Sequence, residues 1–85
     1  MEYRIKRTLS CFNKQNDKLI FDICFEKFDL GLFQAEFGVA KDNPMYDSFK
    51  VKVKNIPLIE EALPPFISIN WNFNDYSYFV EAIEN

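Results

Sequence analysis

The chain has 85 residues, of which 48% are hydrophobic and 18% aromatic, and its formal net charge is −3. This length and hydrophobic content fit one globular domain and exclude an intrinsically disordered chain. The sequence contains no His, the residue on which most acid–base and metal chemistry near neutral pH depends, so the composition argues against an enzyme.

Residues 3–12 and 18–26 each alternate between polar and apolar side chains, and the five residues between them are polar. This pattern predicts a β-hairpin. If Phe12 faces Lys18, nearly every apolar side chain of the hairpin lies on one face, with Arg7 as the exception. The predicted inward face comprises Tyr3, Ile5, Leu9, Cys11, Leu19, Phe21, Ile23 and Phe25.

The two cysteines, Cys11 and Cys24, fall on opposite faces of this hairpin and out of register. No disulfide is therefore expected between them, and free thiols fit a reducing compartment. The chain shows neither the apolar core of a signal peptide nor a run of about 18 apolar residues that could span a membrane. We expect a cytoplasmic protein of one domain, residues 1–85.

Asp29 and Gly38 bracket eight residues whose apolar side chains recur at helical spacing. Asp is a favourable helix N-cap, and Gly readily adopts the left-handed conformation that ends a helix. A short helix is predicted over residues 30–37, with its apolar side packed on the sheet.

Residues 47–54 alternate again and predict a third strand, from one face of which Lys50, Lys52 and Lys54 project. Two interpretations of this lysine row are open. The lysines could follow a nucleic-acid backbone while nearby rings stack on bases. Alternating lysines also prevent an exposed edge strand from pairing with another chain, and we favour this second interpretation.

Pro57 is placed to begin a second helix, and Pro64 and Pro65 to end it. Residues 66–73 then alternate as a fourth strand. Its inward side chains are Ile67, Ile69, Trp71 and Phe73, and its outward side chains include Ser68, Asn70 and Asn72.

Residues 76–84 fit either a helix or a strand, and their Tyr, Phe and Val content favours the strand. A tight turn before them would pair Trp71 with Tyr78 and Ile69 with Val80. The predicted order is β-β-α-β-α-β-β. This is an α+β fold with a mainly antiparallel sheet of about five strands and two short helices against one face.

No catalytic, cofactor-binding or metal-binding residues are predicted. Two cysteines on opposite faces and no His cannot assemble a zinc site, and two glycines cannot form a glycine-rich phosphate loop. No His is present to activate a cysteine nucleophile. The adjacent carboxylates Glu60 and Glu61 fit solvated surface charge better than a glycosidase pair.

Residues 55–85 contain no Lys or Arg but five carboxylates, a formal charge of −5, whereas residues 1–54 carry a net charge of +2. The acidic stretch also contains six aromatic residues, although a packed core alone could account for them. An acidic surface rich in rings suits a basic protein and repels a phosphate backbone, so neither nucleic acid nor membrane is expected as a partner. The predicted partner-binding residues are Glu60, Glu61, Asp75, Tyr76, Tyr78 and Glu81.

Three segments resemble a family of short bacterial proteins with no established activity: residues 3–5 (YRI), 37–47 (FGVAKDNPMYD) and 76–82 (YSYFVEA). In size, acidity and character the chain is also similar to the small immunity proteins of bacterial contact-dependent growth inhibition and related toxin systems. The second resemblance implies a cytosolic inhibitor that binds a cognate toxin domain, often a basic nuclease, and blocks its active site or a nearby surface.

Two other functions are compatible with the sequence. One is a non-enzymatic structural or regulatory protein-interaction domain, including a homodimer formed through the third strand. The other is a single-stranded nucleic-acid binder that uses the lysine row.

Overall fold

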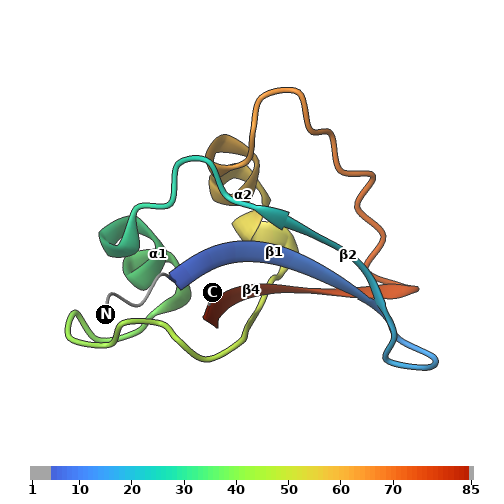
Figure 1. Ribbon diagram of the computed structural model, residues 1–85, viewed down its shortest axis with the longest axis horizontal. Helices are drawn as coiled ribbons and strands as arrows, with labels where there is room; N and C mark the ends of the chain where they lie inside the picture. The colour runs from blue at the N-terminus through green and yellow to red at the C-terminus, as the bar shows by residue number, and fades with distance from the viewer. Residues whose placement is uncertain (1–4, 85) are drawn as a thin grey trace.

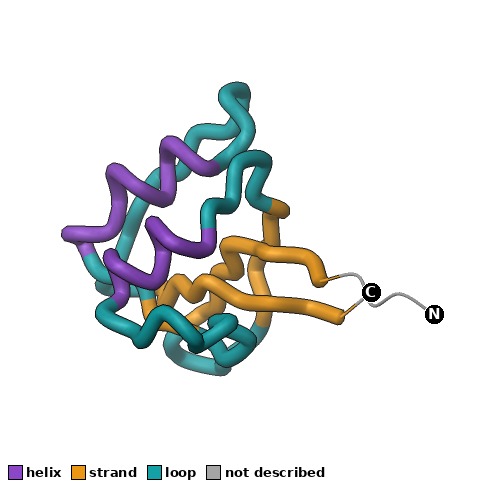
Figure 2. Tube along the Cα trace, turned by 90° about the vertical axis from the view of Figure 1, so that its left-hand side faces the viewer, coloured by secondary structure: helices purple, strands orange, loops and turns teal. Residues whose placement is uncertain are grey.

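The computed structural model describes residues 5–84, which form one antiparallel sheet with both helices on the same side (Figures 1 and 2). The elements are β1 (Ile5–Asn13), β2 (Leu19–Cys24), α1 (Leu30–Phe37), β3 (Phe49–Lys50), the 3₁₀ turn η1 (Val53–Asn55), α2 (Ile56–Ala62) and β4 (Tyr76–Glu84). The strand order is β2-β1-β4-β3. The α+β class is as predicted, but the described residues form four strands instead of about five. Tyr3, which the sequence assigns to the inward face, lies outside the described residues.

The predicted hairpin of β1 and β2 is confirmed, but its register differs by two residues. Leu9 lies opposite Ile23, and Cys11 lies opposite Phe21. A shift of two residues leaves each side chain on its original face, so these side chains still point inward. A register irregularity directly after Cys11 removes Leu19 from the inward set, and Leu19 is 51% exposed.

The last strand is also confirmed, but its pairing differs from the prediction. β4 pairs with β1 along its whole length through nine residue pairs, and with β3 on its other side. Both edges of β4 are therefore occupied where residues 66–73 would have paired. The expected pairs Trp71–Tyr78 and Ile69–Val80 are wrong, and residues 66–73 form no strand.

The third strand is much shorter than the predicted residues 47–54. β3 ends at Lys50, and after one more bond to β4, from the Val51 amide to the Tyr78 carbonyl (2.8 Å), the chain turns into η1. The side chain of Asn55 causes this turn, because its Oδ1 accepts the Lys52 amide (2.8 Å). A strand of two residues offers only a short edge for the homodimer considered above.

Both helices form where the sequence places them. The Asp29 carboxylate accepts the Leu32 amide at the start of α1 (3.1 Å), and Gly38 ends the helix at a φ of 67°. α2 begins one residue before Pro57 and ends at Ala62, just before the two prolines.

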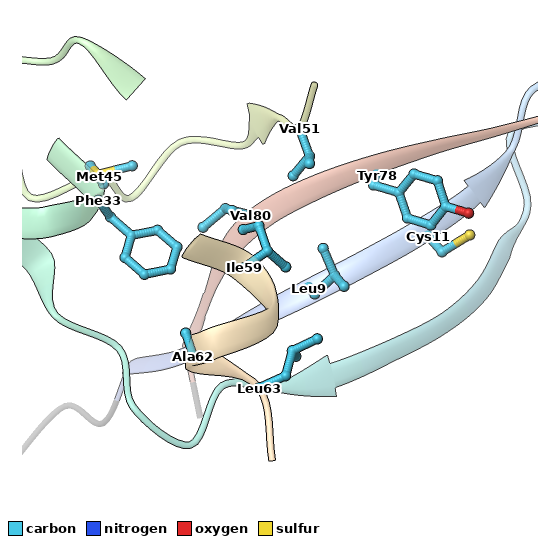
Figure 3. Close-up of a cluster of buried hydrophobic side chains, with 10 residues drawn as sticks. All are labelled: Leu9, Cys11, Phe33, Met45, Val51, Ile59, Ala62, Leu63, Tyr78 and Val80. Carbon is cyan, nitrogen blue, oxygen red and sulfur yellow. The ribbon is translucent and has the colours of Figure 1, made fainter. Parts of the chain in front are cut away.

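The core lies between the sheet and the helices (Figure 3). Leu9 of β1, Val80 of β4, Ile59 of α2 and Phe33 of α1 are all fully buried at its centre. Residues 64–75, here called the covering segment, run from α2 over the sheet to β4 (Figure 1). Four of their side chains pack against the core, namely Ile67, Ile69, Trp71 and Phe73. The inward positions predicted for this segment are therefore confirmed although the strand is not.

The two thiols are free, as predicted. Cys11 points inward and is buried, whereas Cys24 lies on the opposite face of the sheet and is exposed. Within residues 5–84, no helix combines the length and the apolar character needed to cross a membrane.

Candidate protein-binding surface

The six predicted partner-binding residues do not form one surface. Glu60 and Glu61 lie on α2, on the helix side of the sheet, and Asp75 lies in the turn before β4. Glu81 alternates with the inward Val80 and therefore faces the opposite side of the sheet.

The two tyrosines lie on the inward side of β4. Tyr78 is 2% exposed, and its hydroxyl accepts the amide of Asn72 (3.1 Å). Burial raises the pKa of Tyr78, and the hydrogen bond from Asn72 opposes this shift. Tyr78 is therefore a core residue without contact area for a partner. Tyr76 is half-buried and lines a hollow whose charged groups are Lys14, Lys50 and Lys52.

Glu60 is tied to the covering segment through Trp71. The indole Nε1 donates to Glu60 Oε2 (3.0 Å), which joins α2 to the segment. The Trp71 ring stacks on Phe73, with centroids 5.7 Å apart and planes 3° apart, and both rings meet Tyr78 edge-on. These aromatic contacts hold the indole in place, so the position of the Glu60 carboxylate is set partly by the core.

Asp75 is held in a compact turn by Asn72. Asn72 Nδ2 donates to Asp75 Oδ2 (3.0 Å), and Asn72 Oδ1 accepts the amides of Asn74 (3.1 Å) and Asp75 (3.2 Å). The hairpin of β1 and β2 meets this turn, because the Lys14 amide donates to the Asp75 carbonyl (3.0 Å) and Lys14 Nζ donates to the Phe73 carbonyl. Lys14 is thus a cation at the border of the acidic region.

Phe66 is an exposed aromatic residue outside the predicted partner-binding set. Its side chain is 83% exposed, in the turn that follows α2, which the Ile67 amide closes on the Pro64 carbonyl (3.0 Å). The sequence pattern indicates this exposure, because Phe66 lies two residues before the outward Ser68 and so falls on the outward face in the alternation of residues 66–73. Phe66 is the most exposed large hydrophobic side chain of residues 5–84, and aromatic residues are enriched at protein interfaces.

These residues define what we call the acidic surface. The name refers to the acidic and aromatic residues of α2 and the covering segment, namely Glu60, Glu61, Phe66, Trp71 and Asp75. α2 and the covering segment contribute no Lys or Arg to it, since residues 55–85 contain none. Cations from other elements stand at its borders, Lys14 beside the turn and Lys27, which lines a small hollow together with Glu61.

Glu81 belongs to a separate surface on the open face of the sheet. It accepts a hydrogen bond from Ser48 Oγ (2.7 Å) beside a hollow of about 370 Å³. Phe12 and Phe79 line this hollow edge-to-face, with centroids 5.8 Å apart. Lys50 lies opposite Phe79 in the sheet, so the open face has mixed charge.

Arg7, the charged exception on the inward face, has a structural role. Its guanidinium donates to the carbonyls of Met45 (2.8 Å) and Pro44 (2.9 Å) and lies over the rings of Phe28 (4.7 Å) and Tyr46 (5.3 Å). Partial burial lowers the pKa of Arg7. Arg7 thus attaches the loop between α1 and β3 to the sheet, a contact that alternation alone does not reveal.

The described residues offer little for covalent or metal chemistry. In residues 5–84 no group of three or more His, Cys, Asp or Glu side chains is placed to hold a metal ion. Burial raises the pKa of the Cys11 thiol, which reduces its thiolate fraction and hence its nucleophilicity.

The fold and the acidic surface together define a small α+β domain whose helix side carries an exposed aromatic ring among carboxylates. The chain belongs to the family described as a domain of unknown function, DUF7683, whose model matches residues 6–81. Comparison with curated proteins finds no match.

Proposed function

We propose that the protein is an immunity-type inhibitor that binds a cognate, cationic toxin domain, such as a basic nuclease, in the bacterial cytoplasm. It acts by binding alone, without catalysis. The observation that carries the proposal is the 83% exposure of Phe66 within the acidic surface. Aromatic residues are enriched at protein interfaces relative to the rest of the surface, so an exposed ring in an acidic segment supports a protein-binding role.

The carboxylates and the ring contribute different parts of such an interface. Glu60, Glu61 and Asp75 attract a basic domain from a distance and orient it, which raises the association rate and rejects acidic partners. Phe66 then enters an apolar pocket on the partner and provides a large share of the binding energy. The carboxylates at the border pair with Lys or Arg of the toxin.

The test is co-expression with the carboxy-terminal domain of a toxin encoded next to the gene. The intact chain is expected to co-purify with that domain and to protect the host cell. Phe66→Ala is expected to weaken binding by about tenfold or more, as for a central interface residue, while the melting temperature stays unchanged because the side chain is exposed. Val53→Ala is the matched control, since Val53 is also exposed (67%) but lies in η1.

Charge reversals separate the two faces of the sheet. The double variant Glu60→Lys and Asp75→Lys is expected to abolish co-purification at physiological salt, whereas Glu81→Lys on the open face is expected to bind normally. If the double variant and Glu81→Lys lose toxin binding equally, the helix side is not the contact surface. Failure of the intact chain to bind or protect would refute the proposed function.

A further inference from the structure

The lysine row is not explained by protection of an edge strand. That explanation requires the lysines to lie on a strand, but β3 ends at Lys50. Lys52 precedes η1, and Lys54 lies within it. Edge protection therefore does not explain the positions of Lys52 and Lys54.

The backbone that carries these lysines is held firmly. Lys52 donates its amide to Asn55 Oδ1 (2.8 Å), and the Asn55 amide donates to the Lys52 carbonyl (2.9 Å). Asn55 is 1% exposed, and its Nδ2 donates to Glu36 Oε2 (2.8 Å). The buried amide thus holds the turn and also donates to Glu36, the carboxylate that lines the larger of the two hollows described below.

Two hollows lie on either side of Lys50 and Lys52, and both lysines line each of them. The larger, of about 480 Å³, is also lined by Lys54, Glu36, Phe37 and Phe49. The smaller, of about 320 Å³, is also lined by Lys14, Phe73 and Tyr76. Each hollow therefore combines cationic side chains with two aromatic rings, and the larger has the size of an ordinary small-molecule site.

We propose that this lysine surface binds nucleotides, either free or as units of a single strand of nucleic acid. Lysines bind phosphate as mobile point charges, and aromatic side chains provide stacking platforms for bases whatever their sequence. Because Lys50 and Lys52 line both hollows, a phosphate bound by these two lysines would connect a nucleotide in one hollow with a nucleotide in the other. The inference is independent of the proposed inhibitor function, which uses the acidic surface.

The acidic composition of the chain does not prevent this binding. Charges beyond about 8 Å are largely screened at physiological ionic strength, so local charge decides the interaction. Four lysines and one carboxylate line the two hollows, and that carboxylate already accepts the Asn55 amide. The net charge of −3 weakens binding at low salt, where screening is least.

The experiment measures fluorescence anisotropy of a fluorescein-labelled ten-nucleotide oligothymidylate with the intact chain at several salt concentrations. The double variant Lys50→Gln and Lys52→Gln is expected to bind about tenfold more weakly, and its log–log salt slope to fall by about 1.4, or about 0.7 for each lost phosphate contact. The matched control, Lys27→Gln with Lys41→Gln, removes the same charge elsewhere and is expected to change neither quantity.

Phe49→Leu tests the ring while it retains an apolar side chain, and is expected to weaken binding without changing the salt slope. Competition with thymidine monophosphate distinguishes free nucleotides from single-stranded nucleic acid as the ligand. The monophosphate displaces the labelled oligonucleotide efficiently only if the lysine surface accepts a free nucleotide. Failure of both the oligothymidylate and fluorescein-labelled thymidine monophosphate to bind overturns the proposal. The proposal is also overturned if the control variant loses as much affinity for the oligothymidylate as the lysine variant does. It is overturned as well if inorganic phosphate displaces the probe as efficiently as thymidine monophosphate, or if labelled decaglutamate binds as tightly as the oligothymidylate. The double variant Lys50→Gln and Lys52→Gln is expected to bind the cognate toxin normally. Toxin binding and nucleotide binding are therefore tested independently.

Discussion

The β1–β4 pair and the covering segment have similar sequence patterns but different structures. In both, apolar side chains alternate and point toward the same core. β1 and β4 are joined by nine residue pairs at the centre of the sheet, whereas the covering segment is attached by side chains such as Trp71 and Tyr78. The difference teaches that alternation specifies which face of a segment is buried, while strand pairing depends on a free neighbouring edge.

The paired strands and the covering segment also have different roles in the molecule. The paired strands provide a platform whose backbone groups are satisfied within the sheet. The covering segment makes fewer backbone hydrogen bonds to the rest of the molecule, and it carries Phe66 and Asp75 at the surface. Segments with fewer backbone hydrogen bonds open more readily and often contact ligands, so the proposed contact surface lies in the less strongly held region.

The largest effect is expected from a cavity in the paired strands. Leu9→Ala should lower the free energy of unfolding by about 3 kcal/mol, because Leu9 is fully buried between β1 and α2. Ile67→Ala in the covering segment should cost roughly half as much, since Ile67 is only half-buried. Urea unfolding monitored by circular dichroism measures both. Equal losses would show that the segment belongs to the core as firmly as the strands do.

Tyr78→Phe tests the junction between the two regions. The hydroxyl accepts the Asn72 amide, so its removal leaves that donor without its partner and should cost about 1 kcal/mol. Hydrogen exchange is expected to accelerate in residues 66–75 and to stay slow in β1. A uniform acceleration across β1 and β4 would contradict the view that the segment is held separately.

Alkaline pH should weaken the same junction. Burial raises the pKa values of Cys11 and Tyr78 in the folded state, so the unfolded chain loses these protons first as the pH rises. Their contribution to stability is complete below the unfolded values of about 8.5 and 10 and declines above them. Urea midpoints measured between pH 7 and pH 11 should therefore fall from about pH 9. Tyr78→Phe should flatten the decline above pH 10, and a midpoint that rises over this range would contradict the assignment.

The smallest effect is expected at the link to α2. Trp71→Phe retains a ring but removes the donor to Glu60, and a hydrogen bond at the surface should contribute about 0.5 kcal/mol. Glu60→Gln, which retains an acceptor oxygen, is the control and should cost less. Urea unfolding by circular dichroism gives both values. A loss above about 2 kcal/mol for Trp71→Phe would indicate that the indole is a core anchor.

Local signals predicted the individual elements well. The Asp29 cap and Gly38 stop define α1, the Pro57 and Pro64 positions bracket α2, and Tyr and Val content identifies β4 as a strand. Each of these signals acts within a few residues, so it can be read without knowledge of the rest of the fold.

The partner-binding residues were harder to predict from local sequence patterns. Glu60 and Glu61 lie on the helix side and Asp75 lies in the turn before β4, but Tyr78 is in the core and Glu81 is on the opposite face. A strand presents its side chains alternately to two faces, and which face meets the helices is decided by partners distant in the chain. Charge content along the chain therefore indicated an acidic region without showing its shape.

The sequence by itself determined the α+β class, the two helices, the strand character of β1, β2 and β4, and most of the inward side chains, because these follow from local conformational preference and periodic burial. Leu19 and Ile5 were predicted to point inward but are exposed. Only the tertiary structure decided that β1 and β3 occupy both edges of β4, that residues 66–73 therefore cover the core as an unpaired segment, and that β3 stops at Lys50. The physical reason is that each strand edge accepts one neighbour, and the competition for that edge involves residues far apart in the chain.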